Sequence, residues 1–281
     1  MTQDKTVFTD HFGKDLSGLK NKRLFLLDMD GTVYNEDRLF DKVPEFLEYI
    51  RSIGGHFVFI TNNSSKSVKD YIKKVNGLGI EADADNFFTS VQATAFLINK
   101  KYRGSKVYCQ CTKSMLDELI TLGIDVTEDD AGDIDIVLVG FDTEMTSEKL
   151  RKTSKLLMTR DVVFLATNPD LRCPVSFGYI PDCGSICQML ENTTEKSPVY
   201  IGKPEATMVE LVMERYGFGP DETVIVGDRL YTDIATGINA GVDSVCVLTG
   251  EATAEDIKNG SIKPAYTLHS VKELWEFLVG K

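Results

Sequence analysis

Two aspartates that stand two residues apart, Asp28 and Asp30, follow an apolar run and precede a glycine in the stretch LFLLDMDGTVY. Such a run is typical of a buried parallel strand, and a chain that turns at Gly31 can bring both carboxylates to one cavity. One carboxylate could then attack a phosphorus atom while the other transfers the proton of the leaving group. Although Asp-Gly is also a common turn pair, the stretch favours a catalytic pair.

Further polar residues follow other apolar stretches of the chain. They are Thr61 and Asn62 after HFVFI, Lys203 after PVYIG, and Asp228 and Asp233 at and after the end of ETVIVGD. In open α/β sheets, ligands collect beyond the carboxyl ends of the strands, so we expect these residues to form one site with the first pair. Taken singly, each could instead be part of a turn or a helix cap.

Together these residue types indicate phosphoryl transfer. Gathered aspartates would repel one another, and a divalent cation such as Mg²⁺, which prefers oxygen ligands, removes that repulsion. The hydroxyl of Thr61, the amide groups around Asn62 and the ammonium of Lys203 are donors of the kind that a phosphate needs. Acids, a metal ion and anion donors are the parts of a phosphoryl-transfer site.

The elements that must position these residues alternate between strands and helices. Apolar runs at 24–27 and 56–60 predict strands, and helical spacing of apolar residues predicts helices near 43–53 and 68–75. The same alternation returns over 198–280, and we expect the strand before Lys203 to belong to it. This order predicts a parallel sheet covered by helices on both faces.

The middle of the chain has strands and helices of its own. A length of 281 residues also favours two domains over one. We therefore predict an α/β protein with a Rossmann-like, doubly wound core formed by residues 1–88 and 197–281, and with a large inserted α/β cap at 89–196.

The charge of the chain limits its partners. A net charge of −12, with Lys and Arg scattered along the sequence, argues against nucleic acid or an anionic membrane as a partner. No apolar stretch approaches the roughly 20 residues that span a bilayer, and the N-terminal stretch lacks the apolar core of a signal peptide. We therefore expect a cytoplasmic protein that binds a small substrate or a cation.

Cysteines and histidines do not suggest a structural zinc site. Cys109 and Cys111, like Cys183 and Cys187, lack the paired C-x2-C spacing of a zinc ribbon. The histidines lie far apart in the sequence and outside any ligand pattern; they are His11, His56 and His269. We expect free thiols in a reducing compartment instead.

Four stretches resemble the motifs of the haloacid dehalogenase superfamily. They are DMDGT at 28–32, TNNSSKS at 61–67, GKP at 202–204 and GDRLYTDIATG at 227–237. The resemblance extends from about Arg23 to Leu278. The large insert between the second and third motifs is similar to that of the class IIA branch, the NagD-like and 4-nitrophenylphosphatase-like phosphatases.

This resemblance implies a phosphatase that acts on small phosphorylated metabolites, such as nucleotides or sugar phosphates. It implies that Asp28 is the nucleophile, which forms an aspartyl-phosphate, and that Asp30 is the general acid and base. Thr61 and Asn62 would hold phosphate oxygens, and Lys203 would neutralise the charge that nucleophile and phosphate share.

The resemblance also implies a metal site and a quaternary structure. Mg²⁺ would be bound by the carboxylates of Asp28 and Asp228 and by the backbone carbonyl of Asp30. Asp233 would orient the water molecules of the metal rather than bind it directly. Cap-mediated dimers occur in this branch, which makes a homodimer plausible, although the sequence shows no clear interface stripe.

Several alternatives stay open at this point. A phosphomutase of the same superfamily would keep both aspartates of the first motif, but mutases are associated with small helical caps. A non-catalytic sensor of a metal ion or a phosphorylated metabolite would also bind these ligands, although a degraded enzyme would be expected to have lost Asp30 or Lys203. The sequence does not identify the physiological substrate or a role for residues 1–22.

Overall fold

The structure, a computed structural model, describes residues 8–280. The chain divides into two compact units. The core unit comprises Met1–Ile60, Gly77–Glu81 and Pro204–Lys281, and the cap unit comprises Thr61–Asn76 and Ala82–Lys203. No helix in the described part of the chain is long and apolar enough to cross a membrane.

The core unit is built around a parallel sheet. Its strands are β1 (Leu24–Leu27), β4 (His56–Thr61), β13 (Thr223–Gly227), β14 (Asp243–Val247) and β15 (Tyr266–Leu268). The sheet order is β15-β14-β13-β1-β4-β5. Every strand of this sheet begins in the core unit except β5 (Phe87–Thr89), whose residues belong to the cap unit. Strand β1 lies in parallel between β13 and β4 and is buried along its whole length, as an apolar run in a central parallel strand should be.

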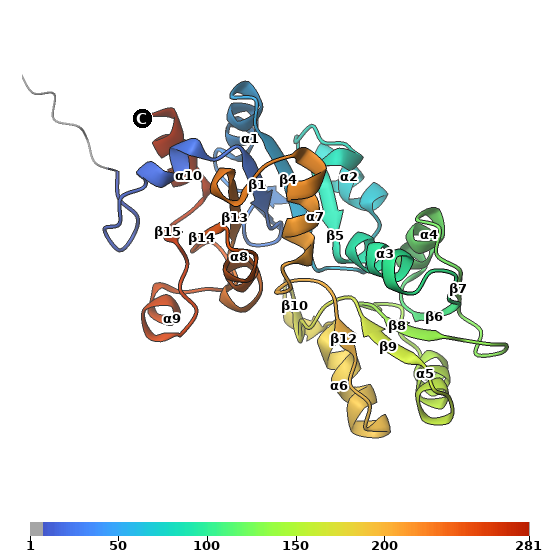
Figure 1. Ribbon diagram of the computed structural model, residues 1–281. Helices are drawn as coiled ribbons and strands as arrows, with labels where there is room; N and C mark the ends of the chain where they lie inside the picture. Colours follow the sequence, from blue (N-terminus) through green and yellow to red (C-terminus); the bar gives the residue numbers. More distant parts are fainter. Residues whose placement is uncertain (1–7, 281) are drawn as a thin grey trace, which may run out of the picture. The chain divides into compact units, whose positions relative to one another are not determined.

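Helices flank this sheet (Figure 1). They are α1 (Val43–Ser52), α7 (Thr207–Tyr216), α8 (Ala235–Ala240), α9 (Ala254–Asn259) and α10 (Val271–Val279), with short 3-10 helices at Ser17–Asn21 and Pro220–Glu222. Helix α1 buries Val43, Phe46, Leu47 and Ile50, which recur at helical spacing. It packs against α10, and α7 packs against α8. A small hairpin, β2 (Tyr34–Asn35) and β3 (Arg38–Leu39), follows β1.

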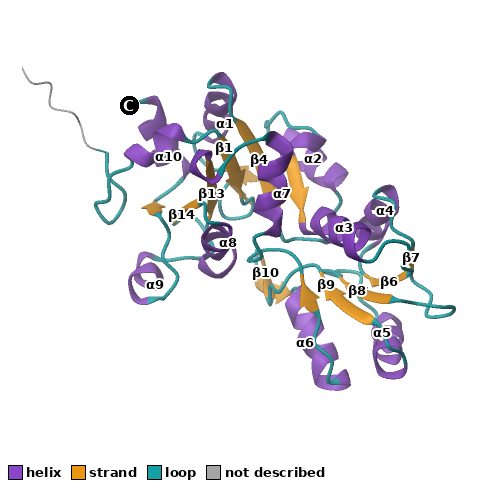
Figure 2. Ribbon diagram, in the orientation of Figure 1, coloured by secondary structure: helices purple, strands orange, loops and turns teal. Residues whose placement is uncertain are grey.

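The cap unit has a parallel sheet of its own. The strand order is β12-β9-β8-β6-β7, with bounds β6 (Val107–Gln110), β7 (Val126–Thr127), β8 (Ile136–Val139), β9 (Val163–Ala166) and β12 (Val199–Tyr200). Read from β7, this is the 2-1-3-4-5 order of flavodoxin-like sheets. Helices α3 (Ser90–Lys101) and α4 (Lys113–Thr121) lie on one face, and α5 (Ser147–Thr159) and α6 (Cys183–Thr194) on the other (Figure 2).

Three further elements complete the cap unit. Helix α2 (Val68–Gly77) falls almost wholly within it, and a 3-10 turn at Ala84–Asn86 precedes β5. An antiparallel hairpin, β10 (Arg172–Val175) and β11 (Gly178–Pro181), leads into α6.

The predicted fold class is confirmed: a Rossmann-like parallel sheet with flanking helices is accompanied by a large α/β cap. The expectation for the strand before Lys203 is wrong. Val199 pairs with Leu165 in the cap sheet, so β12 does not belong to the core sheet. Val199 is 60% exposed, because β12 is a short edge strand. Its apolar residues therefore did not indicate which of two sheets it would join.

A buried carboxylate holds the start of α2. Glu118 of α4 is 8% exposed, and its Oε2 accepts a hydrogen bond of 2.7 Å from the backbone N–H of Val68. Its Oε1 is buried and has no hydrogen-bond partner among the described residues. Desolvation raises the pKa of Glu118 to about 7, with a smaller contribution from Asp70, although the bond from Val68 acts in the opposite direction.

This raised pKa should make the stability of the protein depend on pH. Between the ordinary value of 4.5 and about 7, folded Glu118 keeps a proton that the unfolded chain has lost, so the free energy of unfolding should fall as pH rises. Glu118→Gln keeps an acceptor for Val68 but does not titrate, and should flatten this fall. Urea unfolding on both sides of the interval measures the difference. The exposed neighbour Asp117→Asn is the control, and an unchanged slope in Glu118→Gln would contradict the assignment.

Candidate active site

Three aspartates of the core unit meet beyond the carboxyl ends of two neighbouring strands. Asp28 directly follows β1 and Asp228 directly follows β13, while Asp233 lies in a π-helical turn at Leu230–Ile234. One carboxylate oxygen from each residue lies within 4.8 Å of the other two. The register explains the meeting of the first two residues, because Leu27 pairs with Val226 in parallel.

Hydrogen bonds from the backbone orient two of these carboxylates. Asp228 is 2% exposed, and its Oδ2 accepts a bond of 2.7 Å from the N–H of Glu251. The Oδ2 of Asp233, which is fully buried, accepts a bond of 3.1 Å from the N–H of Arg229. These bonds fix where the negative charge lies, but they leave like charges close together inside the protein.

Glycines allow the backbone to approach the acidic cluster, which we define as Asp28, Asp228 and Asp233. A Cβ at Gly250 would lie 2.0 Å from Asp228 Oδ2, and one at Gly31 would lie 2.7 Å from the same atom. Gly31 also has a φ of +89°, which only glycine adopts without strain. No side chain larger than hydrogen fits at either position unless Asp228 moves.

The acidic cluster could hold a hard divalent cation. Its donors are carboxylate oxygens alone, which suit Mg²⁺ better than metals that prefer nitrogen or sulfur. A bound cation would also compensate the like charges that the fold brings together. Asp30 lies in the turn two residues after Asp28, where it forms a β-bridge with Tyr34, and its carboxylate is not part of the cluster.

In the cap unit, the side chain of Asn62 holds the backbone of Lys203. Asn62 Oδ1 accepts a bond of 2.8 Å from Lys203 N–H, and Asn62 Nδ2 donates one of 2.9 Å to Lys203 C=O. Nδ2 also donates to Asp170 Oδ2 at 3.1 Å. Both N–H groups of the amide are therefore used within the protein, and a phosphate could be reached from Asn62 only through its backbone N–H.

Asp170 and Asn168 extend this network, and sequence reasoning did not single them out as site residues. Asp170 is buried, and its N–H donates to Asn168 Oδ1 at 3.0 Å. Asn168 Nδ2 in turn donates to the backbone carbonyl of Asn62 at 2.8 Å. A usable signal was present, because the stretch TNPD begins directly after the apolar run of β9.

Thr61 and Lys203 are both buried polar residues. Thr61 is the last residue of β4, and its Oγ1 accepts a bond of 3.1 Å from Asn63 N–H. This bond closes the turn that follows the strand. Lys203 comes three residues after β12, and its backbone is fixed from both sides by Asn62.

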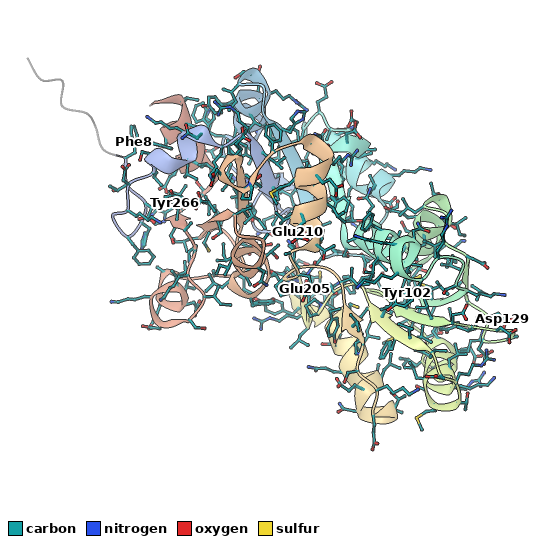
Figure 3. The ribbon with its side chains drawn as sticks, viewed as in Figure 1. Phe8, Tyr102, Asp129, Glu205, Glu210 and Tyr266 are labelled. Carbon is teal, nitrogen blue, oxygen red and sulfur yellow. The ribbon has the colours of Figure 1, made fainter. Side chains whose placement is uncertain are left out.

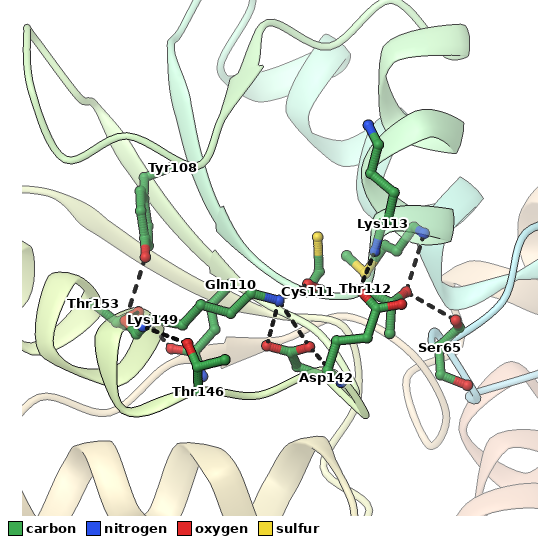
Figure 4. Close-up of polar contacts among 12 residues, drawn as sticks. Ser65, Tyr108, Gln110, Cys111, Thr112, Lys113, Asp142, Thr146, Lys149 and Thr153 are labelled. Carbon is green, nitrogen blue, oxygen red and sulfur yellow. Dashed lines mark hydrogen bonds and ion pairs between the residues drawn. The ribbon is translucent and has the colours of Figure 1, made fainter.

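A second polar cluster lies within the cap unit, at the carboxyl ends of β6 and β8 (Figure 4). Lys149 Nζ lies 3.1 Å from both carboxylate oxygens of Asp142 and donates to the carbonyl of Cys111 at 2.6 Å. Burial raises the pKa of Asp142, while Lys149 acts to lower it. The ion pair is satisfied internally, so this cluster holds α5 to its sheet rather than offering open ligand positions.

Family models match both ends of the chain. A model described as haloacid dehalogenase-like hydrolase matches residues 25–125, and a second one, described as HAD-hydrolase-like, matches residues 200–274. These ranges contain all the residues of the acidic cluster, together with Thr61, Asn62 and Lys203.

Individual proteins are similar over nearly the whole chain. An acid sugar phosphatase from Staphylococcus saprophyticus is 33% identical over 91% of this chain and 98% of its own. Among solved structures, a 4-nitrophenylphosphatase from Thermotoga maritima matches with a TM-score of 0.88 and 36% identity, over 93% of this chain and 99% of its own. NagD from E. coli K-12 matches with a TM-score of 0.81 and 29% identity, over 89% and 97%. The chain therefore belongs to the haloacid dehalogenase-like hydrolases, as a phosphatase of their NagD-like, class IIA branch.

Proposed function

We propose that this phosphatase hydrolyses phosphate monoesters of small metabolites in a Mg²⁺-dependent reaction that passes through an aspartyl-phosphate on Asp28. The acidic cluster is the observation that carries the proposal. Three carboxylates with oxygens within 4.8 Å of one another are costly to gather without a cation, and phosphoryl transfer uses such a cation.

Asp28 would act as the nucleophile. Its carboxylate attacks phosphorus, the bond between phosphorus and the ester oxygen breaks, and Asp30 donates a proton to the leaving oxygen. Asp30 then removes a proton from a water molecule, which attacks the phosphorus of the aspartyl-phosphate. The bond between phosphorus and the Asp28 oxygen breaks, inorganic phosphate leaves, Asp28 is again a free carboxylate, and Asp30 is again protonated.

The cluster and the preceding turn would hold the metal ion. Asp28 and Asp228 would bind Mg²⁺ through their carboxylates and Asp30 through its backbone carbonyl, while Asp233 would orient metal-bound water. When bound, the ion would neutralise the gathered carboxylates and the substrate phosphate. The hydrogen bonds to Asp228 and Asp233 support this assignment, because they hold both carboxylates in fixed orientations.

Thr61, Asn62 and Lys203 would bind the phosphate. In this proposal the hydroxyl of Thr61 and the backbone N–H of Asn62 donate hydrogen bonds to phosphate oxygens. The ammonium of Lys203 neutralises the negative charge of these oxygens. The amide of Asn62 would then act on Lys203 by fixing its backbone. Asp170 would be a positioning residue, since it receives the second N–H of that amide.

A sugar phosphate is the substrate class to test first, because one relative is named as an acid sugar phosphatase. Phosphate release should be measured across sugar phosphates, nucleotides and 4-nitrophenyl phosphate, with Mg²⁺ and with a chelator. Turnover that is insensitive to the chelator would contradict the metal requirement. The homodimer, the cytoplasmic location and the cap boundaries at 89–196 stay predictions.

Replacing the nucleophile should abolish turnover without unfolding the protein. Asp28→Asn is nearly isosteric, so we expect kcat to fall by roughly 10⁴-fold or more while the thermal midpoint stays near that of the parent. Phosphate release and a thermal melt measure the two quantities. Retained turnover in the variant would remove Asp28 from the nucleophile role.

The effect of removing the general acid should depend on how well the leaving group departs without a proton. Asp30→Asn should slow the hydrolysis of a sugar phosphate by about 10²-fold or more, because an alkoxide leaves poorly without a proton. Hydrolysis of 4-nitrophenyl phosphate should slow less, because nitrophenolate hardly needs protonation. Single-turnover rates with both substrates test this, and equal losses would argue against proton donation by Asp30.

Adding one methyl group beside the metal ligands should weaken metal binding. Gly250→Ala places a Cβ against Asp228, so we expect the Mg²⁺ concentration for half-maximal activity to rise by about tenfold. Activity should recover at high Mg²⁺. Gly219→Ala is the matched control, because a Cβ there would meet nothing within 4 Å. An identical Mg²⁺ dependence in the two variants would contradict the metal assignment.

A further inference from the structure

Two histidines of the core unit meet outside the acidic cluster. His11 Nδ1 lies 3.3 Å from His269 Nε2, although the two residues are 258 positions apart in the chain. The ring centroids are 4.9 Å apart and the planes lie at 83° to one another. The histidines lie far apart in the sequence and outside any ligand pattern, but the fold brings the N-terminal segment beside the residue after β15 and joins this pair.

The backbone that carries both imidazoles is held in place. His11 N–H donates to the carbonyl of Thr267 at 2.8 Å. Asp10 accepts three backbone hydrogen bonds, one of them from Thr267 N–H at 3.0 Å. His269 N–H donates to Glu273 Oε2 at 2.8 Å. The pair is thus presented by a fixed scaffold rather than by two free surface loops.

The two rings line a cavity of about 340 Å³. Glu273, Glu276 and Phe277 of α10 also line it. Figure 3 marks this end of the core unit by Phe8, which lines the cavity, and by Tyr266 of β15. Nitrogen donors, nearby negative charge and open space are therefore combined at one place.

The distance between the ring nitrogens suits a shared metal ion. Two nitrogens bound to one tetrahedral Zn²⁺ at about 2.0–2.1 Å are about 3.3–3.4 Å apart, which matches the separation of His11 Nδ1 and His269 Nε2. Imidazole selects Zn²⁺, Ni²⁺ and Cu²⁺ over Mg²⁺ and Ca²⁺. A direct hydrogen bond between the rings gives a similar distance, so the two states must be separated by experiment.

We propose that His11 and His269 form a second metal site, which binds a divalent transition-metal ion such as Zn²⁺, Ni²⁺ or Cu²⁺. Water molecules complete the coordination, because the cavity beside the two imidazoles leaves room for them. The site differs in ligand chemistry from the all-oxygen acidic cluster, and it does not depend on the proposed catalytic mechanism. Its effect is to clip the N-terminal segment to the end of β15.

Cu²⁺ binding followed by electron paramagnetic resonance tests the site directly. The Asp228→Asn protein serves as the parent, because the acidic cluster is then less able to compete for the ion. We expect one tightly bound Cu²⁺ whose spectrum shows coupling to two imidazole nitrogens. In His11→Ala and in His269→Ala one nitrogen should be lost, and affinity should fall by about tenfold or more. His56→Gln is the control and should bind as the parent does.

Thermal unfolding with Zn²⁺ gives an independent measurement. Zn²⁺ should raise the melting temperature of the parent, because it binds the folded chain, and it should not raise that of His11→Ala/His269→Ala. If the double variant does not fold, His11→Asn and His269→Gln, which keep polar side chains, replace it. Unchanged nitrogen coupling and unchanged Cu²⁺ affinity in the paired variants would overturn the proposal, as would a parent spectrum without two imidazole nitrogens. The Mg²⁺-dependent phosphatase rate of the histidine variants should equal that of the wild type.

Discussion

The repulsion among Asp28, Asp228 and Asp233 is the constraint around which the core unit is built. Carboxylates this close inside a protein disfavour the folded state unless hydrogen bonds and a cation compensate them. The parallel pairing of β1 with β13 brings the first two together, and the N–H groups of Glu251 and Arg229 restrict where the charges lie. The stability of the sheet therefore offsets the unfavourable free energy of holding three carboxylates close together.

In the cap unit, the residues around Lys203 hold the backbone of a flexible, positively charged side chain in place. A lysine has a long side chain with several rotatable bonds, so the position of its ammonium depends on how well its backbone is held. Asn62 binds both the N–H and the C=O of Lys203, and Asp170 and Asn168 hold Asn62 in turn. A chain of buried polar residues thus replaces the support that a central strand gives to Asp28.

Much of this arrangement was predictable, because its signals are local. Asp28 and Asp228 stand directly after continuous apolar runs, and the carboxyl ends of parallel strands share one edge of a sheet. Other features depend on pairing that no local pattern records. The edge strand before Lys203 joins the cap sheet, and the side-chain amide of Asn62 binds the backbone of Lys203. His11 contacts His269, which is 258 positions away in the sequence. Short apolar stretches and single polar residues do not encode their partners.

The close approach of glycines to the acidic cluster has a consequence for mutation. Gly31 and Gly250 contribute no chemical group, yet any substitution places a carbon atom within 3 Å of Asp228 Oδ2. Gly227 is in the same position with respect to Asp233, since a Cβ there would lie 2.3 Å from its side chain. Substitution at these backbone positions is therefore restricted by space, because an added side chain would displace Asp228 or Asp233. A random screen for inactive variants should recover residues that never touch the substrate.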